Sequence, residues 1–82
     1  EMNDSANIEE DENGRVRVYY YDQQIDITDL FNEENICRIT LMHEGLPTYL
    51  EITRKGNGSY PFSQTDHLSD EEKELYSYVT TE

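Results

Sequence analysis

The sequence has few cationic residues, a single alanine, a single cysteine and no tryptophan. Six Lys and Arg residues stand against 19 Asp and Glu residues, so the formal net charge is −13 at neutral pH. This charge repels nucleic-acid phosphates and anionic lipid headgroups at long range. Direct binding to DNA, RNA or a membrane surface is therefore strongly disfavoured. A basic protein is instead attracted, and its association weakens as salt rises.

The single cysteine, Cys37, excludes an internal disulfide. Small secreted domains often depend on disulfides, so this absence slightly favours the cytoplasm, while a secreted or surface-exposed location stays open. No apolar run approaches the ~18 residues that cross a membrane, and no signal-peptide pattern is present. The sequence therefore predicts a soluble protein.

The first residues are strongly acidic. Residues 1–12 hold six acids and no base, and we expect a disordered acidic tail there. The alternative is that Ala6 to Glu10 form an edge strand, which pairs across a turn at residues 11–14. Residues 13–82 are predicted to form one small domain, because a chain of this length holds one domain at most.

Alternating apolar and polar residues predict antiparallel strands in the middle of the chain. A strand through Val16 to Tyr20 is followed by a short returning strand around Ile25 and Ile27. Ile36 to His43 and Thr48 to Thr53 form a hairpin, with its turn at Glu44-Gly45-Leu46-Pro47, since proline lacks the donor of a central strand. The residues expected to face the core are Val16, Val18, Tyr20, Cys37, Ile39, Leu41, Leu50 and Ile52.

Ser69-Asp70-Glu71-Glu72 has the pattern of a capping box and predicts a helix that runs to about Tyr78. Leu75 and Val79 would then share one face of this helix. The predicted fold class is α+β, a small three- or four-stranded antiparallel sheet with a C-terminal helix and an acidic mobile N-terminal tail.

The candidate chemical motifs are incomplete. Gly14 occupies the glycine position of a calcium loop, but Tyr20 stands where that loop needs a bidentate Glu. Cys37, His43 and His67 lack the spacing of zinc ligands. Cys37 is predicted to face the core, away from any activating histidine. We therefore expect no metal, no cofactor and no enzymatic activity.

Tyrosines among carboxylates are the remaining signal. Tyrosine gives rigid contact area with one polar tip, and carboxylates pair with Arg and Lys of a partner. The simpler alternative is that the acids form the solvated face of a helix and the tyrosines cover a thin sheet. The residues predicted to bind a partner are Tyr19, Tyr21, Tyr49, Glu51, Asp70, Glu71, Glu72, Glu74, Tyr76 and Tyr78.

Charge and tyrosine content together predict a small acidic inhibitor or regulator, a monomer or weak dimer that docks on a basic surface of a partner protein. In the sharper form of this hypothesis, the carboxylates replace phosphates and block a DNA- or RNA-handling protein. The alternative is a solubilising or accessory domain of a longer or exported protein, with no inhibitory role.

Overall fold

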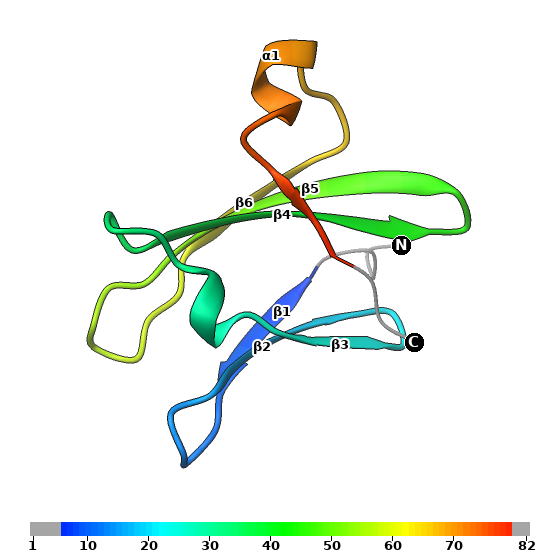
Figure 1. Cartoon of the computed structure of the whole chain (residues 1–82). Helices are drawn as coiled ribbons and strands as arrows, with labels where there is room; N and C mark the ends of the chain where they lie inside the picture. The colour runs from blue at the N-terminus through cyan, green and yellow to red at the C-terminus, as the bar shows by residue number, and fades with distance from the viewer. Residues whose placement is uncertain (1–5, 80–82) are drawn as a thin grey trace.

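Two sheets pack face to face in the computed structural model, which describes residues 6–79 (Figure 1). The N-terminal sheet has the order β1-β2-β3 and consists of β1 (Asn7–Glu10), β2 (Val16–Tyr20) and β3 (Gln23–Asp26). The C-terminal sheet has the order β6-β5-β4-β7 and consists of β4 (Ile36–His43), β5 (Leu46–Thr53), β6 (Phe62–Thr65) and β7 (Ser77–Tyr78). The two helical turns are η1 (Thr28–Leu30), between the sheets, and α1 (Asp70–Lys73).

This architecture corrects the predicted α+β fold, because the protein is mostly β and has two sheets instead of one. The predicted capping box does form: the Ser69 hydroxyl accepts from the Glu72 N–H at 3.1 Å, and the Glu72 carboxylate accepts from the Ser69 N–H at 3.0 Å. However, α1 ends at Lys73 after one turn and buries no residue. Residues 77–78 pair with β4 as a parallel strand.

Two physical causes end the helix early. Tyr78 and Val79 have high β-propensity, and an isolated helix without a packed apolar face is marginal in water. The edge of β4 also offers main-chain partners, so the Val79 N–H donates to the Thr40 carbonyl at 3.4 Å. Leu75, expected on the buried helix face, is 62% exposed.

The predicted tail over residues 1–12 is wrong where the structure describes it. β1 pairs antiparallel with β2, Ala6 is buried, and Ile8 packs against the core. The Asp11 carboxylate stabilises the intervening turn, because it accepts backbone N–H bonds from Asn13 and Arg15 at 2.8 and 3.0 Å. The edge-strand alternative is therefore confirmed, and residues 1–5 lie outside the described residues.

The inner faces of the sheets form one hydrophobic core, and the sequence prediction of the inward faces is confirmed. Its buried side chains from β2 to β5 and the adjoining Ile27 are Val16, Val18, Tyr20, Ile25, Ile27, Cys37, Ile39, Leu41, Leu50 and Ile52. Burial raises the pKa of the Cys37 thiol to about 11, so this thiol stays protonated at neutral pH.

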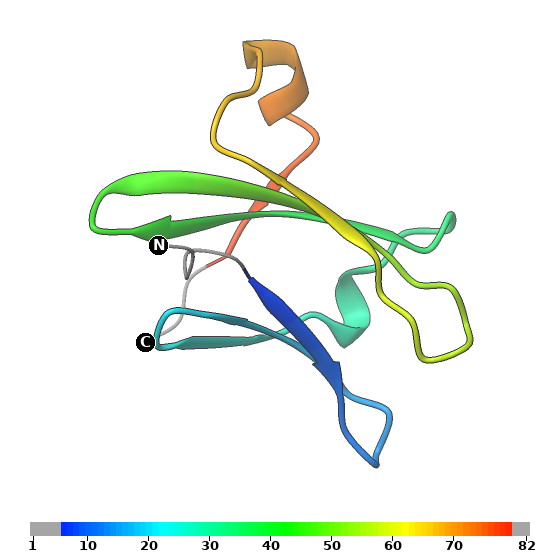
Figure 2. The same ribbon diagram turned by 180° about the vertical axis from the view of Figure 1, so that it is seen from behind.

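β1 and β6 connect the two sheets along one side, which Figure 2 shows from behind. The Ala6 N–H donates to the Gln64 side-chain carbonyl at 3.2 Å, and the Tyr60 hydroxyl donates to the Glu10 carboxylate at 2.9 Å. These bonds close the sandwich on this side.

The β4–β5 turn is shorter than predicted. It consists of Glu44 and Gly45, whose φ values of 54° and 81° fit the left-handed region of a two-residue hairpin turn. Pro47, predicted to lie in the turn, belongs to β5 opposite Met42. In this register the proline nitrogen faces away from β4, and β6 pairs with β5 only from Tyr49 onward. No ladder bond is lost there, so β5 tolerates the proline.

Candidate functional site

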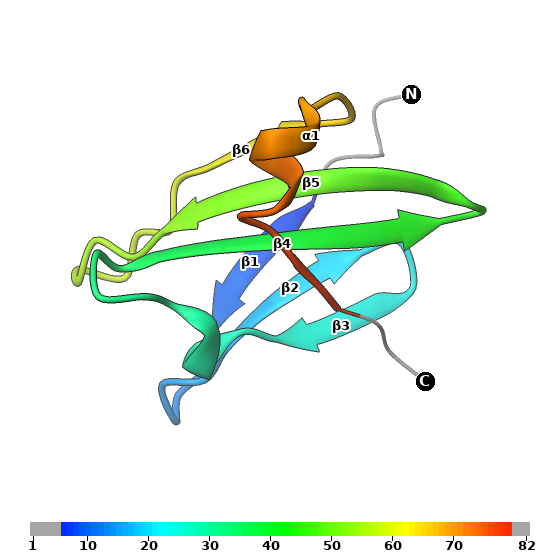
Figure 3. The same ribbon diagram turned by 45° about the horizontal axis from the view of Figure 1, so that its top comes forward.

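The chain between β6 and β7 crosses the outer face of the C-terminal sheet. Figure 3 shows α1 above β4 and β5, with the following segment running down to β7. This path carries a group of carboxylates, here called the acidic cap, that consists of Asp70, Glu71, Glu72 and Glu74. All of these carboxylates are exposed.

Tyr49 does not have the exposure predicted for a partner-binding residue. It points to the outer face of β5 as expected, but it is only 7% exposed. The Tyr76 ring covers it edge-on, with ring centroids 5.7 Å apart and an interplanar angle of 77°. The strand prediction was right about the face, but Tyr76, which lies between α1 and β7, covers Tyr49 there. Tyr49 therefore supports Tyr76 and is hidden from a partner.

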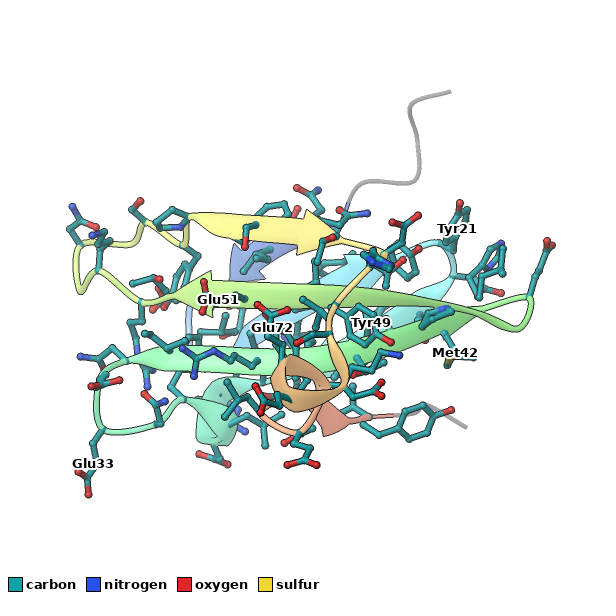
Figure 4. All side chains as sticks on the ribbon, turned by 90° about the horizontal axis from the view of Figure 1, so that it is seen from above. Tyr21, Glu33, Met42, Tyr49, Glu51 and Glu72 are labelled. Atoms are coloured by element: carbon teal, nitrogen blue, oxygen red, sulfur yellow. The ribbon has the colours of Figure 1, made fainter. Side chains whose placement is uncertain are left out.

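Glu51 lies beside these tyrosines and is paired within the protein. Its carboxylate accepts from Arg38 Nε at 2.9 Å, across the β4–β5 ladder. The pKa of the Tyr76 hydroxyl is raised, first by burial and then by the negative charge of Glu51, against the opposite effect of Arg38. Glu72 contributes a further upward shift, and Figure 4 shows it on the same side of the molecule as Glu51 and Tyr49.

Few positively charged side chains pair with the carboxylates of the acidic cap. Hydrogen bonds from Ser69, first its backbone and then its hydroxyl, lower the pKa of Glu72, so this carboxylate remains ionised. Lys73 approaches Asp70 at 3.8 Å. Within residues 6–79, no ion pair involves Glu71 or Glu74. The cap therefore carries excess negative charge at neutral pH.

The arginines of the chain are engaged elsewhere. Three of the four form ion pairs at 2.8 to 3.5 Å, namely Arg15 with Asp26 and Asp29, Arg17 with Asp11, and Arg38 with Glu51. The Arg54 guanidinium lies 4.2 Å from the centroid of the Phe31 ring. None of these groups neutralises the cap.

The predicted partner-binding residues separate into two groups. Tyr49, Glu51 and Tyr76 join the acidic cap on the outer face of the C-terminal sheet, and Tyr78 lies on the adjacent edge strand, 63% exposed. Tyr19 and Tyr21 belong to the N-terminal sheet: Tyr19 is half-buried in β2, and Tyr21 lies in the β2–β3 turn. The ten predicted residues therefore do not form a single contact surface.

A second feature, which sequence reasoning missed, is a groove of about 260 Å³ at the open end of the sandwich. We term it the end groove. Its lining includes Tyr20 and Tyr21 from the N-terminal sheet and His43, Leu46 and Thr48 from the C-terminal sheet. From the sequence, His43 was considered only as a zinc ligand, although this residue is in phase with Ile39 and Leu41 on β4. That alternation would have placed it inward.

No protein family, curated protein or solved structure significantly matches the chain. Among the described residues, no group of three or more His, Cys, Asp or Glu side chains could hold a metal ion. No helix in the described part of the chain is long and apolar enough to cross a membrane. What the geometry defines is a small two-sheet β protein with a strongly acidic exterior, and its function is inferred from its own residues.

Proposed function

We propose that this protein is a small acidic inhibitor or regulator that binds a partner protein through a basic surface of that partner. The observation that carries the proposal is the acidic cap. Its carboxylates are exposed and short of counter-ions. Leu75, 62% exposed, directly follows them, and Tyr78, 63% exposed, lies in β7 shortly after.

This combination is typical of a protein-binding surface. Aromatic and aliphatic side chains supply contact energy when a partner covers them, and surrounding charges set orientation and association rate. Carboxylates that reach Arg or Lys form charge-assisted hydrogen bonds. Leu75 was assigned to a helix face by the sequence, and its exposure adds contact area that the predicted site lacked.

The distribution of acids favours docking by the cap over nucleic-acid mimicry. A mimic of a phosphate backbone requires carboxylates in a row of regular spacing. The exposed acids instead lie in strands of the N-terminal sheet, in most of the connecting turns and in α1, as Glu9, Glu12, Asp22, Asp26, Glu33, Glu44, Asp66 and Glu71 show. We therefore propose docking on a basic protein surface in its general form, without phosphate mimicry.

A pair of matched charge reversals tests the proposal. The cap variant carries Glu71→Lys and Glu74→Lys, which leaves Glu72 in place because its carboxylate completes the capping box. The control variant carries Glu33→Lys and Glu34→Lys, on the exposed loop before β4. Both variants change the net charge equally and alter exposed side chains, so both should fold, as circular dichroism can verify.

The immobilised wild-type protein should capture a basic protein from a lysate at low salt and release it as salt rises. The cap variant should lose this partner, while the control variant should retain most of it. Equal loss in both variants would show that overall charge, not the cap, attracts the partner. Capture of nothing by the wild type would instead favour the solubilising or accessory domain.

A further inference from the structure

The end groove is a preformed feature, held by contacts between the sheets. The Tyr20 hydroxyl and the Thr48 hydroxyl share a buried hydrogen bond of 2.9 Å. Gln23 Nε2 donates to the Met42 carbonyl at 2.8 Å, which joins β3 to β4. Because these bonds fix both walls, an occupant would not need to order the groove on entry.

Tyr21 adds backbone strain at the same place. Its φ is 55°, in the left-handed region that a bulky aromatic residue rarely adopts. Its ring stacks on His43, with the centroids 3.5 Å apart and the planes 3° from parallel. Strained residues persist where the surrounding structure holds them, and they are concentrated at binding sites. Figure 4 shows Tyr21 at the same end of the molecule as Met42.

The lining of the end groove combines an apolar surface, aromatic rings and one carboxylate. Leu46 is 69% exposed, and Pro47 follows it along the wall. Asp66 contributes an exposed carboxylate, and no Lys or Arg lines the groove. This lining suits a side chain with an apolar stem and a cationic head.

We infer that the end groove receives an arginine side chain presented by the basic partner. The stem would lie on Leu46, and the planar, weakly hydrated guanidinium would contact the exposed Tyr21 ring and Asp66. Arginine fits better than lysine, whose compact ammonium is strongly hydrated and does not stack. This inference rests on the proposed function for the basic partner, but its site is separate from the acidic cap.

Titration of the full chain with short peptides tests the inference without the partner. The probe is N-acetyl-Gly-Arg-Gly-amide, and the matched control contains citrulline, which keeps the shape of arginine but carries no charge. Two-dimensional amide NMR should show saturable shifts at Tyr21, His43, Leu46, Thr48 and Asp66. We expect binding of the citrulline peptide to be weaker by about tenfold, since the lost contacts are a cation–π interaction and an exposed ion pair.

Two variants locate the contact. Asp66→Asn should weaken binding of the arginine peptide by about threefold, because its carboxylate is exposed. Leu46→Ser should also weaken it, and the exposure of Leu46 means that the fold should tolerate this change. The cap variant, with Glu71→Lys and Glu74→Lys, should bind the peptide in the groove as the wild type does.

Shifts confined to the acidic cap, or equal binding of the arginine and citrulline peptides, would overturn the inference. The result is independent of the capture experiment. If the arginine peptide binds the end groove but the cap variant still captures the partner, the groove inference holds and the cap proposal fails. If the cap variant loses the partner but the peptide shifts no groove residue, the cap proposal holds and the groove inference fails.

Discussion

The hydrogen bond between Tyr20 and Thr48 offers a sharp test of how the two sheets are joined. The two hydroxyls are 2.9 Å apart and come from β2 and β5, which lie in different sheets. Their residues are only 4% and 8% exposed. Tyr20→Phe or Thr48→Val therefore leaves one buried hydroxyl without its partner.

The magnitude follows from this burial. An unsatisfied buried hydroxyl costs about 1–3 kcal/mol, whereas removal of both hydroxyls together is close to neutral by comparison. In a domain of this size, 1 kcal/mol corresponds to a change in Tm of about 4–8 °C. Each single variant should melt well below the wild type, and the double variant should be more stable than the sum of the two losses predicts.

Urea and thermal unfolding followed by circular dichroism measure this double-mutant cycle, with unchanged m-values as the check that the unfolded state is comparable. Tyr78→Phe is the control, because this exposed tyrosine should change the free energy of unfolding by less than about 0.5 kcal/mol. Additive losses for Tyr20→Phe and Thr48→Val would refute the reasoning, since groups that share no bond do not couple.

Two further predictions concern the core and the pH dependence of stability. Ile39→Ala removes a fully buried side chain and should lower the free energy of unfolding by about 2–5 kcal/mol in urea titrations, while an unchanged midpoint would contradict the assigned core. Hydrogen bonding by Thr28, then by Arg15, holds the pKa of Asp26 well below its ordinary value of 3.8. The ionised Asp26 therefore contributes fully to the free energy of unfolding above about pH 4, and this contribution is lost as the pH falls. Between pH 5 and pH 2 the free energy of unfolding should therefore fall more in the wild type than in Asp26→Asn. Both proteins lose charge repulsion as their other carboxylates are protonated, so the difference between them reports Asp26 alone. Equal losses would show that protonation of Asp26 does not cause the loss of stability.

The alternation of apolar and polar residues predicted the strands correctly where one face of a strand is buried. The alternation of Val16 and Val18, and of Ile39 and Leu41, identified the inward faces correctly because burial demands apolar side chains at every second position. Ser69 and Glu72 likewise identified the start of α1, since a capping box consists of contacts within one helical turn.

The errors arose where pairing with another strand competes with the local preference of the same residues. Tyr78 was assigned to a helix, but the edge of β4 provided strand hydrogen bonds. Residues 7–10 were assigned to a tail on their charge, but β2 provided a partner and Arg17 an ion pair for Asp11 at 2.8 Å. The edge of β4 cannot be identified from the sequence around Tyr78, and the pairing of residues 7–10 across the 11–14 turn was given only as the alternative, because the charge of residues 1–12 favoured a tail.

The candidate site was predicted only in part. Its residue types and the outer face of β5 were visible in the sequence, yet the burial of Tyr49 depends on Tyr76 crossing above it. The end groove could not be predicted, because it joins residues at the ends of β2, β4 and β5 with Tyr21 and Asp66. Partner binding by these residues stays a prediction that the experiments above address.

By itself, the sequence determined the net charge of −13, the inward faces of the central strands and the start of α1. These properties depend on composition or on neighbours within a few residues. Only the tertiary structure decided that two sheets form, that the acids of α1 lie above the C-terminal sheet, and that Tyr21 stacks on His43. Such contacts join residues far apart in the chain, and their free energy arises only when both partners are in place.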